Sequence, residues 1–240
     1  MANILLSRHD LIKAYDTLVK GIEQNAHDDN DTGERAYGGV IRAGKGNLVE
    51  SLAKNLVIIA WSELNQKLSR LDLTQREAIK IRIKNEYISK IENEKVKEFI
   101  QRNSENYFYK FRTDVHVMID NKFVLGIECK AYTENAMLKR IMVDFSFLHS
   151  IYPEAKCVLL QLESQLTGDY SQIYKDTIYG SYSSHSIMSY FENNLNIVTL
   201  LEGERKVNEP IHKGEFYKEL EIEALDKAVE KIKSLLKDFI

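Results

Sequence analysis

The chain has 240 residues, of which 44% are hydrophobic and 29% charged, a composition typical of a folded protein with a substantial core. Its formal net charge of -3 excludes a uniformly basic surface, although 33 Lys and Arg can still gather on one face. The two cysteines, Cys129 and Cys157, form neither a disulfide framework nor a zinc-binding pattern. Neither a leader peptide nor an apolar run of membrane-spanning length is evident, so we expect a cytoplasmic protein without membrane contact.

The first part of the sequence is predicted to be mainly helical. Hydrophobic periodicity predicts an amphipathic helix over residues 8–24. The polar stretch 25–46 contains five of the eleven glycines and is predicted to be a mobile loop. Two further helices are predicted over 48–71 and 74–101, with Thr74 as the N-cap of the second.

The pattern then changes to alternating strands and helices. Strands are predicted over 107–119 and 123–131 with a tight turn at 120–122, and over 156–163 and 196–201. Helices are predicted over 134–151, 184–193 and 215–239. This order indicates an α/β fold with a mixed central sheet flanked by helices. We expect one domain over 1–240, with a core at about 46–201, an N-terminal helix and glycine-rich loop in 1–45, and a C-terminal helix at 215–239.

Two predicted neighbouring strands carry Asp114, Glu128 and Lys130. Side chains alternate along a strand, so Glu128 and Lys130 share one face, and a short hairpin can bring Asp114 beside them. Two converging carboxylates form a hard oxygen site suited to Mg²⁺. A lysine beside such a site can orient a water molecule and stabilise charge on a phosphate. The three residues are therefore candidate catalytic residues.

A structural ion pair explains the same residues. An acidic residue two positions before a lysine also occurs at Asp120–Lys122, Glu154–Lys156 and Glu204–Lys206, in predicted turns or at element edges. Only the Glu128–Lys130 pair ends an apolar strand that follows a strand bearing an aspartate. An unpaired charge would be costly there, which favours the catalytic interpretation.

This arrangement resembles the PD-(D/E)XK nuclease superfamily, in particular type II restriction endonucleases. The resemblance maps the family's acidic residues onto Asp114 and Glu128 and its lysine onto Lys130, with Thr113 in place of the motif's proline. It implies a restriction-endonuclease-like core with helical additions, and Mg²⁺ held by both carboxylates and the Cys129 carbonyl, with Glu50 as a further candidate ligand. Whether His116, Gln161 or Glu163 joins the site stays open.

The resemblance also implies the substrate and the assembly. The substrate would be double-stranded DNA cut at a short palindrome, of the interrupted CTNAG kind if the size of the chain is a guide. A palindrome calls for two active sites related by two-fold symmetry, hence a homodimer. Two alternatives stay open: another nuclease with this core, acting in repair or on junctions, and a DNA-binding protein without catalysis.

Residues 39–46 nearly match a phosphate-binding P-loop, but Gly46 stands where Ser or Thr is required, so we expect no nucleotide cofactor. Arg35, Arg42 and Lys45 on this stretch are candidates for DNA contact, although a plain surface loop explains them too. Ser183, Ser184 and His185 could read base edges. A cap on the next helix by Ser183 or Ser184 is the simpler explanation of that segment.

Overall fold

The structure, a computed structural model, describes residues 6–28, 34–74, 77–168, 170–171, 173–174, 177–178 and 180–240. For residues 22–28, 34–43, 173–174 and 177–178 it describes the backbone only. The helices are α1 Arg8–Asp28, α2 Glu34–Glu63, α3 Asn85–Ser89, α4 Glu94–Arg102, α5 Asn135–Ile151, α6 Tyr182–Met188 and α7 Ile222–Leu236. The strands are β1 Leu71–Asp72, β2 Ile79–Arg82, β3 Phe108–Phe111, β4 Val115–Ile119, β5 Lys122–Glu134, β6 Lys156–Gln165, β7 Ile173–Tyr174, β8 Thr177–Ile178 and β9 Leu195–Thr199.

A mixed sheet of five strands, in the order β1-β4-β5-β6-β9, forms the centre of the molecule. The pairs β1–β4 and β4–β5 are antiparallel, whereas the pairs β5–β6 and β6–β9 are parallel. Asp120 and Asn121 close the β4–β5 hairpin with φ angles of 48° and 64°. Aspartate and asparagine tolerate this left-handed conformation, which suits a two-residue hairpin turn. The predicted α/β architecture and its hairpin are confirmed.

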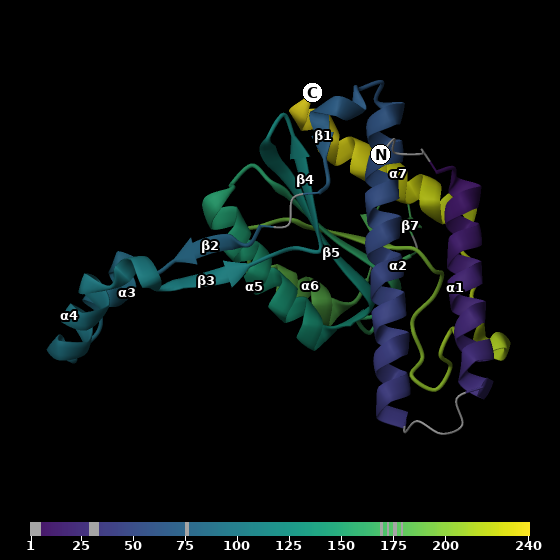
Figure 1. The fold of residues 1–240 in the computed structure, drawn as a ribbon, viewed down its shortest axis with the longest axis horizontal. Coiled ribbons are helices and arrows are strands. Elements are labelled where there is room, and N and C mark those ends of the chain that lie inside the picture. The colour runs from purple at the N-terminus through teal and green to yellow at the C-terminus, as the bar shows by residue number, and fades with distance from the viewer. Residues whose placement is uncertain are drawn as a thin grey trace.

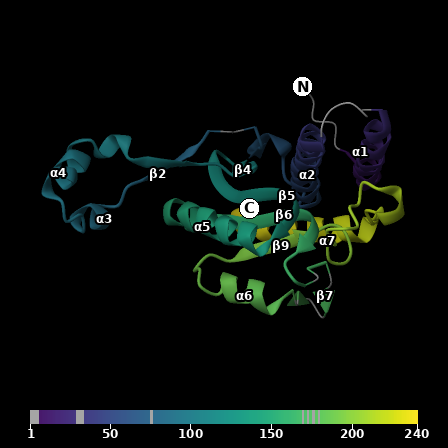
Figure 2. The ribbon, with the colours of Figure 1, turned by 90° about the horizontal axis from the view of Figure 1, so that it is seen from below.

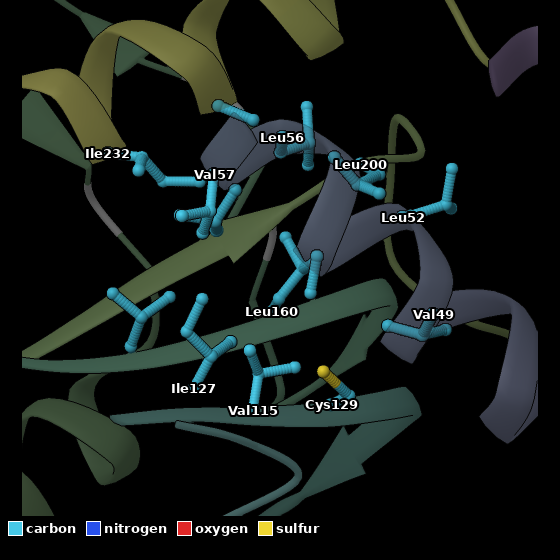
Figure 3. Packing of buried hydrophobic residues seen from close by; sticks show 14 of the residues in the cluster. Val49, Leu52, Leu56, Val57, Val115, Ile127, Cys129, Leu160, Leu200 and Ile232 are labelled. Atoms are coloured by element: carbon cyan, nitrogen blue, oxygen red, sulfur yellow. The ribbon is translucent and has the colours of Figure 1, made fainter. Parts of the chain in front are cut away.

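Helices cover both faces of this sheet (Figures 1 and 2). Helices α1, α2 and α7 pack on one face around a core that includes Trp61, Leu125 and Ile232. Figure 3 shows Leu52, Leu56 and Val57 of α2 above side chains of β4, β5 and β6. Helix α5 covers the other face through a second core that includes Phe145 and Leu159. No described helix is long and apolar enough to span a membrane.

An arm formed by residues 79–111 projects from this body (Figure 1). Its base is the antiparallel β2–β3 ribbon, and its tip consists of α3 and α4. Our prediction of one helix over 74–101 is wrong. The segment 79–83 alternates isoleucine with basic residues, and Ile79 and Ile81 pack on the α5 side as a strand face does.

Three other predictions need correction. Of the predicted loop 25–46, residues 25–28 belong to α1 and 34–46 to α2, and 29–33 lie outside the described residues. A glycine costs about 1 kcal/mol in a helix, but extending a helix already formed at 48–63 and packed on α1 offsets this. The predicted strand 107–119 is two strands in different sheets, separated by a bend at Asp114. The predicted helix 48–71 ends at Glu63, and β1 follows it.

Candidate active site

Asp114 lies in the bend between β3 and β4, where the chain passes from the arm into the central sheet. The preceding residue, Thr113, is buried, and its hydroxyl donates a hydrogen bond to the Val115 carbonyl at 3.0 Å. The Asp114 Oδ2 atom accepts a hydrogen bond from the Cys129 backbone N–H at 2.7 Å. A buried anchor on one side and a backbone donor on the other thus hold the carboxylate beside β5.

Glu128 and Lys130 lie on the face of β5 opposite Cys129, whose side chain points toward α2 (Figure 3). The Lys130 Nζ atom lies 2.6 Å from Glu128 Oε1, 3.1 Å from the Cys129 carbonyl oxygen and 3.4 Å from Asp114 Oδ2. The structure therefore brings together the three residues that the sequence predicted as catalytic. One ammonium group contacts three oxygen atoms, two from β5 and one from the bend.

The electrostatics of this cluster reflect its partial burial. The exposed fraction of the side chain is 38% for Asp114, 19% for Glu128 and 29% for Lys130. Burial raises the pKa of Glu128, the charge of Lys130 opposes this rise, and Asp114 adds to it. Burial alone would lower the pKa of Lys130, but Glu128 and Asp114 outweigh it and leave that pKa raised. The lysine is therefore held in its charged form.

The donor atoms of this cluster fit a divalent metal ion. The described residues contain no group of three or more His, Cys, Asp or Glu side chains placed to hold a metal. Two carboxylates and a backbone carbonyl nevertheless converge on the Lys130 ammonium, which occupies the position of a cation. Oxygen ligands of this kind are those that Mg²⁺ prefers. Asp114, Glu128 and the Cys129 carbonyl could hold such an ion if Lys130 moved aside.

Glu50, the further candidate ligand, lies on α2 and forms an ion pair with Lys54 at 2.6 Å. Burial is the main cause that raises the pKa of Cys129, and Glu50 is among the carboxylates that add to it. Glu50 therefore lies on the side of β5 that the Cys129 thiol faces. His116 lies elsewhere: it is buried and packs edge-on against Phe123 with ring centroids 5.2 Å apart.

Two polar residues of β6 extend the site across the sheet. Gln161 is paired in register with Lys130, is fully buried and donates to Thr199 Oγ1 at 3.0 Å. Glu163 is 3% exposed and forms an ion pair with Lys218 at 3.1 Å. Gln161 is thus tied to the neighbouring strand, whereas Glu163 faces the cleft described next.

A cleft of about 460 Å³ adjoins Lys130. Four basic side chains, Lys45, Lys130, Arg205 and His212, line it together with Glu163. The Lys45 Nζ atom lies 3.3 Å from His212 Nδ1, and burial lowers the pKa of Lys45. The Arg205 guanidinium stacks on the Tyr132 ring at 3.9 Å. A half-buried basic cleft beside a carboxylate pair can accept the phosphates of a polyanion.

Arg205 and His212 did not emerge from the sequence. They lie in the chain that follows β9, outside any strand or helix of the described part. The signal that could have revealed Arg205 is its place beyond the carboxyl end of a parallel strand, where ligands of α/β proteins commonly bind.

The three residues predicted to read base edges differ in their exposure. Ser184 is fully buried and hydrogen-bonds Ser181 Oγ at 2.6 Å as well as the Tyr170 hydroxyl, so its side chain does not reach the surface in this structure. Ser181, rather than either predicted serine, caps α6. Ser183 and His185 are exposed. Arg35 and Arg42 belong to α2, and their side chains lie outside the described residues.

A mixed sheet that presents two carboxylates and a lysine beside a basic cleft is the arrangement expected of a metal-dependent nuclease. No family model matches the chain. The type II restriction enzyme DdeI from Desulfomicrobium norvegicum is 49% identical over 221 residues, which cover 91% of each chain. The chain therefore belongs to the type II restriction enzymes, the site-specific deoxyribonucleases of restriction–modification systems. A low-resolution structure of the native BbvCI A2B2 tetramer aligns over 98% of this chain and 93% of that chain, with 11% identity and a TM-score of 0.36.

Proposed function

We propose that this chain cleaves double-stranded DNA with Mg²⁺ held by Asp114, Glu128 and the Cys129 carbonyl. The observation that carries the proposal is the contact of one ammonium group with all three of these oxygen donors, at 2.6 to 3.4 Å. The ion would polarise the scissile phosphate and offset the charge on the leaving oxygen.

The residues of the chain have separate roles in this proposal. Lys130, released from the carboxylates, would orient the attacking water and donate a hydrogen bond to a phosphate oxygen. Asp114 keeps its place because the Cys129 N–H donates to it. Lys45 and Arg205, in the adjoining cleft, would hold phosphates of the strand being cut. Glu50 on α2 stays a further candidate ligand of the ion.

We further propose that the target is a short palindrome, of the interrupted CTNAG kind. Ser183, His185, Arg35 and Arg42 stay candidates for DNA contact. A palindrome has two-fold symmetry, so two copies of the chain would each cut one strand. The dimer in solution would have about twice the 27.8 kDa mass of one chain.

The test is cleavage of plasmid DNA by purified protein in Mg²⁺, followed by sequencing of the fragment ends. Discrete fragments that share one end sequence would support the proposal, and a chelator should abolish them. A smear would contradict site specificity, and cleavage that persists in the chelator would contradict the metal. Sedimentation of the free and DNA-bound protein tests the dimer, which a strict monomer in both states would refute.

A further inference from the structure

The outer face of the β2–β3 ribbon carries three cations that the active site does not use. Strand register places Lys80 opposite Lys110 and Arg82 opposite Phe108. Because side chains alternate along each strand, these four residues share one face. Lys80, Arg82 and Lys110 are exposed, whereas Phe108 is half-buried between them. We refer to Lys80, Arg82 and Lys110 as the ribbon cations.

This arrangement costs the free protein stability. Like charges directly opposite each other on paired strands are destabilising. Among the described residues, no carboxylate forms an ion pair with any of the three ribbon cations. Their contacts are instead aromatic: the Nζ atoms of Lys80 and Lys110 lie 4.9 and 5.7 Å from the centroid of the Phe108 ring. An exposed lysine gains only about 0.5–1 kcal/mol from such a contact.

The opposite face of the ribbon fixes it to the body. Ile79, Ile81 and Phe111 pack with the core under α5. The Tyr109 ring contacts Phe147, with centroids 5.7 Å apart, and its hydroxyl donates to Asp144 at 3.4 Å. The ribbon cations therefore lie on the side turned away from this packing, on a strand pair whose base is anchored.

The ribbon is also directly connected to the active site. Strand β3 ends at Phe111 and Asp114 follows three residues later. The Cα atoms of Lys110 and Asp114 are four residues apart, so they lie within about 14 Å of each other even if that segment is fully extended. Duplex DNA carries one phosphate charge per roughly 1.7 Å of its axis. A duplex at the active site thus brings several phosphates within reach of this face.

We propose that the outer face of the ribbon binds the phosphate backbone of double-stranded DNA through Lys80, Arg82 and Lys110. The inference rests on the proposed function, since it takes the same duplex as its ligand. Charge complementarity carries it: three cations without carboxylate partners in the described chain lie on one face, in a protein whose net charge is -3.

The experiment compares wild type with Lys80→Gln/Lys110→Gln and with a control of equal charge, Lys227→Gln/Lys237→Gln, which alters exposed lysines at the C-terminal end. Dissociation constants are measured in Ca²⁺ at several salt concentrations, on a duplex that wild type cuts and on one that it leaves intact. Each phosphate contact contributes about 0.9 to the slope of log K against log salt, so the ribbon variant should lose about 1.8. When the salt concentration is lowered from roughly 200 to 50 mM, the affinity of wild type should therefore rise about tenfold more than that of the variant.

The outcomes separate the two proposals. A smaller salt slope on both duplexes, with an unchanged melting temperature, would support the ribbon as a phosphate-binding surface. A variant with the wild-type slope would overturn the proposal and leave the lysines as protection of exposed strand edges. An equal loss in the control would also overturn it, because net charge would then explain the effect. Binding does not require cleavage, so failure of wild type to cut would refute the proposed function alone.

Discussion

The central sheet and the arm support their strands in different ways. All five residues of β4 are buried, and β5 lies between two cores, one under α2 and one under α5. The ribbon of the arm is covered on one face only. In the arm's helices, the exposed fraction is 59% for Tyr87 and 62% for Phe99. Packing on both faces holds side chains within the narrow limits that catalysis needs. Elements with few buried apolar contacts have a lower free energy of local unfolding.

This difference matches the division of labour that we propose. Glu128 and Lys130 lie on β5, which is fixed from both sides, and Asp114 lies in the bend beside it, while the ribbon cations lie on an element that is anchored at its base. Electrostatic contact with a phosphate backbone tolerates small displacements, whereas positioning a water at a phosphorus atom does not. Four changes test whether the two regions behave in this way.

The largest effect should come from Asp114→Asn. The amide oxygen can still accept a hydrogen bond from the Cys129 N–H, so the fold should be kept, but the charge that would hold the metal is lost. Cleavage should fall by orders of magnitude while binding of the duplex in Ca²⁺ stays close to wild type. A cleavage assay and a gel shift measure the two. Near-normal cleavage would show that Asp114 does not hold the metal.

Lys130→Met should reduce both cleavage and stability. Without metal, Glu128 loses its ion pair in a half-buried place, which should cost a few kcal/mol. Mg²⁺ should restore much of the melting temperature, because it would take the place of the ammonium among the three oxygens, but it should not restore cleavage. Thermal unfolding with and without Mg²⁺ tests this. A loss of stability that Mg²⁺ leaves unchanged would favour a purely structural ion pair.

Removal of the arm's tip should have little effect on the body. Ile83 and Tyr107 are joined by a backbone hydrogen bond of 3.0 Å, so an Asn-Gly turn can replace residues 84–106 between them. We expect the free energy of unfolding to change by no more than about 1 kcal/mol, as is usual for changes away from a core. Circular dichroism during heating measures it. A much lower melting temperature would show that the tip supports the body.

The same contrast explains what could be predicted from the sequence. The β4–β5 hairpin, α5 and β6 were predictable because burial on one or both faces leaves a strong periodic pattern. The candidate site could be predicted from the same pattern, because Asp114, Glu128 and Lys130 interrupt apolar stretches of the sequence. In the arm, charged residues at helical spacing outweighed the short alternation at 79–83. The cleft could not be predicted, because it brings Lys45 of α2 and His212, which are 167 positions apart, into contact.

The smallest effect should be seen in Lys45→Met, and it should depend on pH. Burial lowers the pKa of Lys45 against the opposing charge of Glu163, so the unfolded chain binds more protons than the folded chain between the two pKa values. The contribution of this lysine to stability is therefore fully present above its ordinary pKa of 10.5 and is lost as the pH falls through the lowered value. At neutral pH the buried charge opposes folding, and the methionine variant should melt higher than wild type, by no more than about 4 °C. The difference should shrink as the pH approaches 10, because wild-type Lys45 then loses its proton.

Lys227→Met, at an exposed position, should show no such trend in the same melts. A Lys45→Met protein that melts lower at neutral pH would mean that attraction to Glu163 outweighs burial, and that the cleft is held together by this lysine rather than strained by it.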